Sequence, residues 1–256
     1  MTALYENVIF GPVRSRRLGL SLGVNLLPTH SKLCNFDCIY CECGWNADNA
    51  HSRRFNSREE VRTRLEEVLG GMVADGTPPD VITFAGNGEP TMHPDFEEII
   101  DDTIALRDRL CPSAKVSVLS NATMIGRESV RRALAKVDNN ILKLDSAFDK
   151  TVRLMNNPCG AYSVAEVVAN LRLFEGNFIL QTMFLRGECN GEVVDNTTER
   201  EVEAWLRIVE ELRPRQVMVY SLDRDTPCKT LDKVPREELQ QIAVRVEQLG
   251  IACSVA

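Results

Sequence analysis

Four of the nine cysteines of this 256-residue chain fall within one short stretch, from Cys34 to Cys43. Three of them, Cys34, Cys38 and Cys41, have the spacing C-x3-C-x2-C, which lets one loop turn three thiolates toward a common point. Soft thiolate ligands select zinc or an iron–sulfur cluster. The spacing therefore predicts a metal site in this loop.

A structural zinc site is the alternative that the spacing leaves open. Such a site would need a fourth ligand, for which the nearby candidates are Cys43, His30 and His51. Structural zinc sites usually take two short ligand pairs from separate segments. Here a single loop carries the thiols and follows a predicted strand, which is where parallel α/β proteins place their active sites.

The cysteine loop resembles the cluster motif of the radical SAM superfamily, and Cys34, Cys38 and Cys41 match it residue by residue. The resemblance implies that the three thiolates hold three irons of a [4Fe-4S] cluster. The open fourth iron would chelate S-adenosylmethionine (SAM), which is cleaved reductively to a 5′-deoxyadenosyl radical while the protein positions and shields it. Tyr40, the aromatic residue before the last ligand, is expected near the adenine of SAM.

A glycine-rich segment after the predicted strand 81–85 resembles a second motif of this superfamily, the GGEP segment. The residues expected to bind the cofactor here are Gly86, Asn87, Gly88, Glu89 and Pro90. Glycines let the backbone approach a ligand closely, and their carbonyls can accept from an ammonium group. Asn87 stands where the first glycine of the family motif is usual.

Polar residues at the ends of later predicted strands complete the candidate site. By analogy with the superfamily, we expect Ser120, Asn121 and Gln181 to reach the ribose or the carboxylate of SAM. Asp145 is expected to face the substrate as a catalytic residue. Polar residues are also common where a strand passes into a loop, so a purely structural role remains the alternative for each.

Among radical SAM proteins, the segment 11–25 is similar to the corresponding region of the wyosine-base synthases that modify tRNA. Its Arg14, Arg16 and Arg17 would bind phosphate groups of RNA or pair with the protein's own carboxylates. Those synthases also use cysteines upstream of the motif and a lysine, whereas this chain has no Cys before Cys34 and no Lys before Lys32. We therefore expect a relative with a different substrate, for which RNA, a peptide and a small metabolite all remain open.

Three of the other cysteines, Cys159, Cys189 and Cys228, follow predicted strands and would form an auxiliary cluster if their loops converged. The default for the remaining thiols, Cys43 included, is a free buried cysteine.

Two further functions compete with the primary hypothesis. One is a glycyl-radical activase that acts on a partner protein, and the other is a zinc-stabilised binding module without catalysis. The primary hypothesis also requires a reductant such as flavodoxin or ferredoxin.

The elements that must position these residues alternate along the chain. Short β-branched runs predict strands at 22–27, 81–85, 116–120, 141–145, 178–185 and 217–222. Amphipathic segments predict helices at 57–74, 94–110, 126–136, 163–174, 198–212 and 235–249. Six βα units fit an open doubly wound sheet or an incomplete barrel, and the resemblance favours a partial (β/α)6 barrel of the TIM type in one domain, residues 1–256.

Composition excludes several classes of protein. Hydrophobic residues make up 44% and charged residues 26% of the chain, as in ordinary globular proteins. The net charge of −7 provides no strong field for nucleic acid or an anionic membrane. No apolar run is long enough to span a membrane, and an odd number of cysteines without an export signal suggests a reducing, cytoplasmic location.

Overall fold

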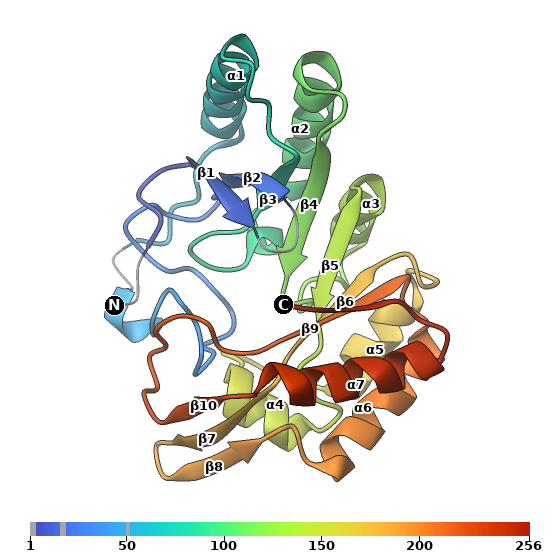
Figure 1. Cartoon of the computed structure of the whole chain (residues 1–256). Helices are drawn as coiled ribbons and strands as arrows, with labels where there is room; N and C mark the ends of the chain where they lie inside the picture. Colours follow the sequence, from blue (N-terminus) through green and yellow to red (C-terminus); the bar gives the residue numbers. More distant parts are fainter. Residues whose placement is uncertain (1–3, 16–18, 50–51) are drawn as a thin grey trace.

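The computed structural model describes residues 4–15, 19–49 and 52–256, in which an eight-stranded sheet forms the centre of the molecule (Figure 1). Its strands, in spatial order, are β1 (Ile9–Ser15), β2 (Gly19–Val24), β3 (Val81–Phe84), β4 (Lys115–Ser120), β5 (Asn139–Lys143), β6 (Ile179–Met183), β9 (Gln216–Tyr220) and β11 (Cys253–Val255). All neighbours pair in parallel except β1, which is antiparallel to β2.

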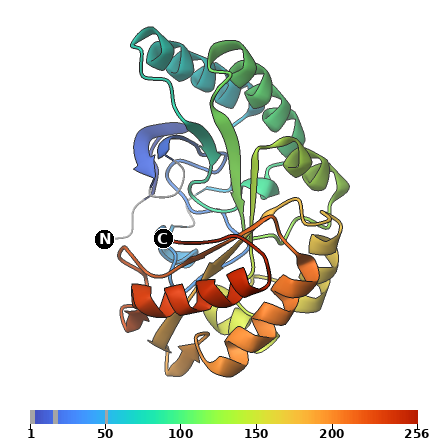
Figure 2. The same cartoon turned by 45° about the vertical axis from the view of Figure 1, so that its right-hand side comes forward.

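The order of the parallel strands identifies the sheet as a partial barrel. From β2 to β11 the strands follow one another as they do in the sequence, without the reversal that defines a doubly wound sheet. Right-handed crossovers in one direction place all helices on the same face. Figure 2 shows this arc of helices on the outside of the sheet. The predicted six βα units and the barrel are therefore confirmed.

The helices that cover the outer face are α1 (Arg58–Ala74), α2 (Phe96–Leu110), α3 (Glu128–Lys136), α5 (Val164–Arg172), α6 (Glu199–Leu212) and α7 (Arg236–Gln248). A shorter helix, α4 (Asp149–Asn156), precedes α5, and two 3-10 turns lie at Ala47–Asn49 and Pro90–Met92. The start of α1 follows from its cap, because Ser57 Oγ accepts a hydrogen bond from Glu60 N at 3.2 Å.

Successive side chains along each strand point alternately to an outer apolar core and to a more polar barrel interior. Ile82 and Phe84 of β3 lie in the large core that includes the helices. Thr83, which points to the other face, shares a 2.8 Å hydrogen bond with Ser21 of β2. Side chains at every second position therefore line the barrel, and those nearest the carboxyl ends of the strands can reach the candidate site.

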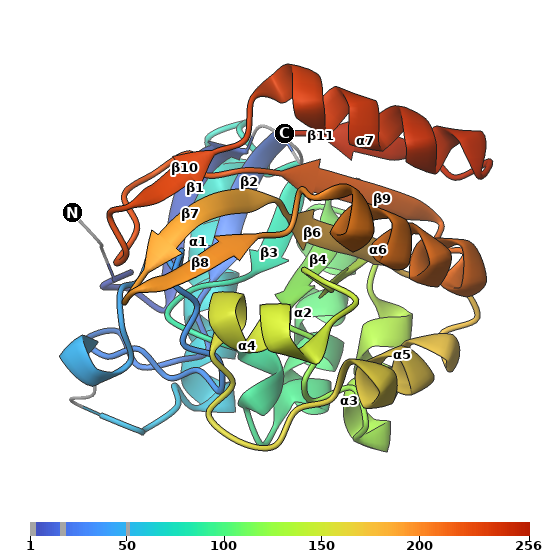
Figure 3. The ribbon, with the colours of Figure 1, turned by 90° about the horizontal axis from the view of Figure 1, so that it is seen from below.

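Several elements lie outside the predicted pattern. A second sheet contains β10 (Leu231–Lys233), β7 (Leu185–Cys189) and β8 (Glu192–Asp195), side by side in Figure 3. The predicted strand 178–185 was too long, because β6 ends at Met183 and a new strand begins at Leu185. The sequence analysis missed β1, because Gly11 and Pro12 interrupt its apolar pattern. It missed β11 because this strand has only three residues.

No helix in the described part of the chain is both long enough and apolar enough to cross a membrane.

Candidate functional site

The cysteine loop and the glycine-rich segment lie at the same end of the barrel. The cysteine loop connects β2 to α1, and Gly86 to Pro90 follow β3, the neighbour of β2 in the sheet. The carboxyl ends of parallel strands meet at one edge, which is where barrel enzymes carry their active sites. The end of β2 lies at Val24, earlier than predicted, so nine residues separate this strand from Cys34.

Backbone pairing joins the two motifs directly. Leu33, the residue before Cys34, forms a parallel bridge with Gly88. Leu33 N donates to Asn87 O at 2.8 Å, and Glu89 N donates to Leu33 O at 3.2 Å. Gly88 has φ +146°, and a Cβ atom added there would lie 1.8 Å from Leu33 O. Only glycine therefore allows the two segments to meet so closely.

Gly88→Ala is expected to lower the free energy of unfolding by more than about 2 kcal/mol, because both the φ angle and the contact with Leu33 forbid the methyl group. A denaturant melt of the metal-free chain measures this effect. Gly71→Ala is the matched control, because Gly71 lies in α1 with no atom within 4 Å of an added Cβ. That change should stabilise the helix by about 0.5–1 kcal/mol. Equal stability of the two variants would contradict the account.

On its other side the cysteine loop is held by the end of α4. The last carbonyls of a helix have no partner within the helix. Here Asn156 O accepts from Asp37 N at 2.9 Å, and Met155 O accepts from Ile39 N at 2.9 Å. The loop therefore completes the hydrogen bonding of α4, and α4 positions the loop.

The side chain of Asn156 connects this helix to the site residues. Its Nδ2 atom lies 2.8 Å from Tyr40 Oη, 2.8 Å from Asp145 Oδ2 and 3.4 Å from Cys38 Sγ. The Tyr40 hydroxyl in turn donates to Asp145 Oδ2. Burial and the neighbouring Asp145 raise the pKa of Tyr40 well above its usual value, so the phenol stays protonated and remains a donor.

Asp145 lies at the centre of a buried network of hydrogen bonds. It is 2% exposed, accepts from Met183 N at 2.9 Å through Oδ1, and lies 3.6 Å from the Lys143 ammonium through Oδ2. Lys143 also donates to Tyr40 Oη at 2.8 Å. Although burial opposes it, the charge of Asp145 raises the pKa of Lys143 above its usual range. This buried network fixes Tyr40 beside the thiol of Cys38.

Glu89 of the glycine-rich segment is buried and bonded within the protein. Its carboxylate accepts from Ser120 Oγ at 2.8 Å, Asn121 N at 2.7 Å and Thr91 N at 3.1 Å. Burial raises the pKa of Glu89, while these hydrogen bonds act in the opposite direction. Glu89 and Ser120 thus hold the end of β4 against the segment, a positioning role that the sequence prediction did not include.

The other residues predicted to bind the cofactor differ in their surroundings. Asn87 Nδ2 donates to Pro28 O at 2.8 Å and Tyr5 O at 2.9 Å, so its side chain holds the loop after β2. Asn121 Nδ2 lies 2.8 Å from Asn35 Oδ1 and 3.8 Å from Cys34 Sγ, beside the first cysteine of the motif. Gly86 O lies 3.6 Å from Cys43 Sγ. Pro90 begins the 3-10 turn Pro90–Met92. Gln181 belongs to β6, where its side chain lies on the face of the strand that lines the barrel.

The three cysteines of the motif suit an iron–sulfur cluster by their chemistry and surroundings. Cys38 is buried, Cys34 and Cys41 are half-buried, and all three thiols are free. Burial raises the pKa of Cys38 to about 11, although the charge of Lys143 acts in the opposite direction. The neighbouring Cys43 and the charge of Lys32 lower the pKa of Cys41 to about 6, although burial acts in the opposite direction.

Apolar side chains pack against the thiols. Phe36, Ile39, Met183, Leu185 and Leu222 belong to the same buried cluster as Cys38, and Cys34 and Cys41 pack against this cluster. No three His, Cys, Asp or Glu side chains in the described ranges form a group that could hold a metal ion. An iron–sulfur cluster is itself polynuclear, so its thiolates are spread over several irons. The free thiols on one loop that packs against an apolar cluster are the observation that fits this group.

The other cysteines do not converge as the auxiliary-cluster hypothesis requires. Cys159 is exposed and lies 3.4 Å from Asn46 Nδ2, beside the cysteine loop. Cys189 and Cys228 are both buried, and Cys228 Sγ lies 3.3 Å from Glu188 O. The three thiols therefore do not share one environment, and the structure lends this hypothesis no support.

Of the three arginines proposed to bind phosphate groups, the structure describes one. Arg14 lies exposed on β1, whereas Arg16 and Arg17 fall outside the described residues, as does His51.

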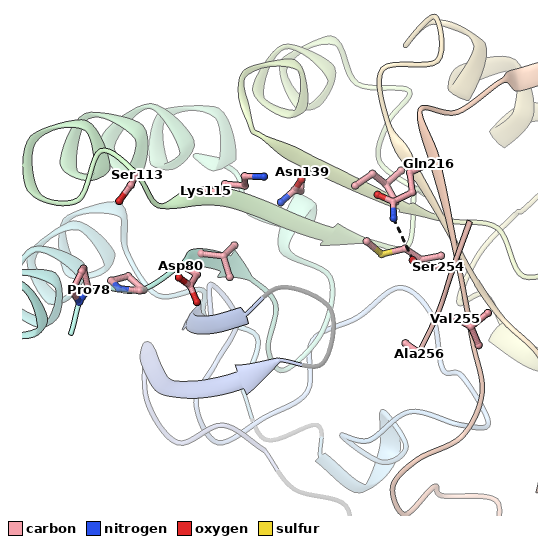
Figure 4. A pocket seen from close by; sticks show the side chains of 13 residues that line it. Pro78, Asp80, Ser113, Lys115, Asn139, Gln216, Ser254, Val255 and Ala256 are labelled. Atoms are coloured by element: carbon pink, nitrogen blue, oxygen red, sulfur yellow. Dashed lines mark hydrogen bonds between the residues drawn. The ribbon is translucent and has the colours of Figure 1, made fainter. Parts of the chain in front are cut away.

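Two cavities bear on the location of the site. A cavity of ≈ 640 Å³ lies at the amino ends of the strands, where Val81, Lys115, Asn139, Ile179 and Gln216 are the first residues of their strands (Figure 4). It lies at the end opposite the cysteine loop. A smaller one of ≈ 380 Å³ adjoins the loop itself and is lined in part by Asn35, Phe36, Cys159 and Tyr162.

Two residues of the site were missed by the sequence analysis. Asn156 was missed because α4 is only eight residues long, although Asn157 followed by Pro158 is a helix stop signal that could have revealed it. Lys32 was not considered as a site residue. It is only 4% exposed, and this burial results from tertiary packing that a local sequence pattern does not predict.

Comparison with known proteins places these motifs in context. The family model "Radical SAM superfamily" matches residues 29–196 of the chain. A UPF0026 protein of Methanocaldococcus jannaschii is 30% identical over 237 residues, which cover 91% of this chain and 68% of that protein. A Brachyspira hyodysenteriae protein named GTPase Obg is 28% identical over 238 residues, and the match spans only 32% of its length.

Solved structures show the same fold at low sequence identity. A radical SAM methyltransferase from Sphaerobacter thermophilus superposes with a TM-score of 0.69 at 15% identity, covering 92% of this chain and 65% of that one. Archaeal TYW1 superposes with a TM-score of 0.54 at 13% identity, covering 89% and 71%. At these identities the likeness concerns the fold alone.

Proposed function

Because this chain belongs to the radical SAM superfamily and is an enzyme of that class, we propose that it binds a [4Fe-4S] cluster through Cys34, Cys38 and Cys41 and cleaves SAM reductively. The observation that carries the proposal is the bridge between Leu33 and Gly88, which joins the cysteine loop to the glycine-rich segment. When bound, the cluster would supply the electron for reductive cleavage of SAM, the chemistry from which a hydrogen-abstracting 5′-deoxyadenosyl radical would arise.

The chain's own residues bind and orient these groups. The backbone of Gly86 to Pro90 offers carbonyl acceptors for the ammonium group of SAM, next to the thiols. The hydrogen bonds of Tyr40 with Asp145 and Asn156 fix its ring in the loop. The apolar shell around the loop keeps water away from a reactive radical.

The substrate and the reductant remain proposals. A flavodoxin or ferredoxin is the kind of donor that we expect, and RNA is one substrate class that the segment 11–25 suggests. Deuterated RNA, peptide and metabolite pools separate the classes, because only the true substrate transfers deuterium into 5′-deoxyadenosine.

Metal analysis of anaerobically reconstituted protein tests the proposed cofactor. We expect about four irons and four sulfides per chain with a brown absorbance. A colourless protein that contains zinc and no iron would support the binding module instead and reject the proposal.

A further inference from the structure

Two polar side chains, those of Lys143 and Gln181, lie next to each other inside the barrel. Lys143 of β5 and Gln181 of β6 occupy paired positions in the parallel sheet. Their neighbours along the strands, Leu142 and Leu180, belong to the outer apolar core. Because successive side chains of a strand alternate between its faces, Lys143 and Gln181 point to the barrel interior.

The amide group of Gln181 has no partner within the protein. The residue is only 7% exposed, yet its side chain forms no hydrogen bond with any residue in the described part of the chain. Buried polar side chains of native proteins are nearly always hydrogen-bonded. The Gln181 amide therefore keeps its hydrogen-bonding capacity for a molecule other than the chain itself.

The ammonium group of Lys143 can also donate to such a molecule. It donates to Tyr40 Oη at 2.8 Å, and Tyr220 Oη lies 3.5 Å away, at the limit of a hydrogen bond. Asp145 Oδ2 lies 3.6 Å from it, and the Asp145 carboxylate already accepts from three other donors. An ammonium group has three N–H donors, and the Lys143 side chain is 18% exposed. One short hydrogen bond therefore leaves this group with donors to spare.

An apolar layer on the amino-terminal side of these two groups closes the barrel beneath them. Ile141 and Ile179, two positions before Lys143 and Gln181, form a buried cluster with Met218. Ile179 and Met218 also line the cavity at the amino ends of the strands, so the layer lies between that cavity and the two polar groups. A few placed polar groups on an apolar lining are typical of sites for small molecules.

We propose that Lys143 and Gln181 bind a carboxylate or phosphate group of a small substrate, an inference that rests on the proposed function and names its substrate class. A ligand that meets an ammonium group and an amide N–H must supply acceptor oxygens. Hydrogen bonds between an ammonium group and an oxyanion are stronger than those between neutral groups. The anionic group therefore anchors the substrate at the floor of the barrel, with its remainder toward the end that carries the cysteine loop.

The carboxylate of SAM is the competing occupant. The segments expected to hold SAM lie beyond the ends of their strands, since the cysteine loop follows β2 and Gly86 to Pro90 follow β3. Gln181 lies two residues before the end of β6, and thus deeper in the barrel. This depth favours the substrate, and the two occupants predict different results in the experiment below.

The experiment measures deuterium transfer from a deuterated metabolite extract, freed of macromolecules and divided on an anion-exchange resin. Reconstituted full chain, SAM and dithionite are added to each fraction, and the readout is the labelled fraction, which is deuterated 5′-deoxyadenosine divided by all 5′-deoxyadenosine formed. We expect label only with the material that the resin retains. Phosphatase treatment of this material should remove the label if the group is a phosphate ester and leave it if the group is a carboxylate.

Gln181→Glu is the decisive variant, because it is close to glutamine in shape and its carboxylate can pair with Lys143 while it repels an anionic ligand. The labelled fraction should fall about tenfold or more, and Lys143→Met should lower it likewise. Gln216→Glu makes the same change at the amino end of the barrel and should leave it at the wild-type value. If the two site residues held SAM instead, total 5′-deoxyadenosine would fall and the labelled fraction would not.

A labelled fraction that stays at the wild-type value in Gln181→Glu or in Lys143→Met would overturn the inference. Label that comes from the unretained material, or only from RNA or peptide, would overturn it equally. If Gln181→Glu forms no product at all, Gln181→Met, which removes only the amide, decides by the same readout. A wild-type chain that forms no 5′-deoxyadenosine would instead refute the proposed function, and the inference with it.

Discussion

Any one of the substitutions Cys34→Ala, Cys38→Ala and Cys41→Ala is expected to abolish both the iron–sulfur absorbance and the formation of 5′-deoxyadenosine. In the proposed site each thiolate would hold a different iron, so the loss of one would leave the cluster without one of its three ligands. The loss should be complete within detection, and iron content, absorbance and product analysis of the anaerobically reconstituted variants measure it.

Two control variants make this prediction specific. Cys111 lies in the apolar core at the end of α2, far along the chain from the loop, so Cys111→Ala should keep its iron and its activity. Cys43→Ala is the stricter control, because Cys43 is a buried thiol only two positions from Cys41. Full iron in Cys41→Ala together with iron loss in Cys43→Ala would assign the third ligand to Cys43 and contradict the proposed site.

Asp145→Ala is expected to destabilise the chain by about 3–5 kcal/mol even without any metal. It removes the acceptor of Tyr40 Oη and Met183 N, and it leaves the ammonium of Lys143 without its carboxylate. An unpaired buried charge carries the largest part of this cost. Denaturant unfolding of the metal-free protein gives the free energy directly.

Two further variants test the cause of that loss. Asp145→Asn keeps an acceptor and should cost less, about 1–3 kcal/mol. Asp101→Ala removes an exposed carboxylate of α2 that pairs with Lys136 and should change stability by no more than about 0.5 kcal/mol. If Asp145 served only to face a substrate, its removal would leave stability unchanged, and that result would refute the network described above.

The parts of the site that were predictable from the sequence are those set by local patterns. Cys34, Cys38 and Cys41 lie within eight positions, so their spacing alone indicates a shared ligand. The periodicity of Val61, Leu65 and Leu69 likewise predicted α1, whose apolar face is buried as expected.

The parts that were not predictable depend on contacts between distant segments. Glu89 is 31 positions from Ser120, and their hydrogen bond exists only because β3 and β4 are neighbours in the sheet. Asn156 approaches Cys38 across 118 positions because the end of α4 pairs with the cysteine loop. Such positioning roles follow from the tertiary arrangement, which the local sequence pattern does not encode.

The measurement that tests the central claim most directly is the formation of 5′-deoxyadenosine from SAM by the anaerobically reconstituted wild-type chain after reduction with dithionite. The account predicts 5′-deoxyadenosine and methionine in equal amounts, formed only when both reductant and cluster are present. A chain that carries its full complement of iron, binds SAM and is reduced, yet yields no 5′-deoxyadenosine above the unreduced control, would contradict it.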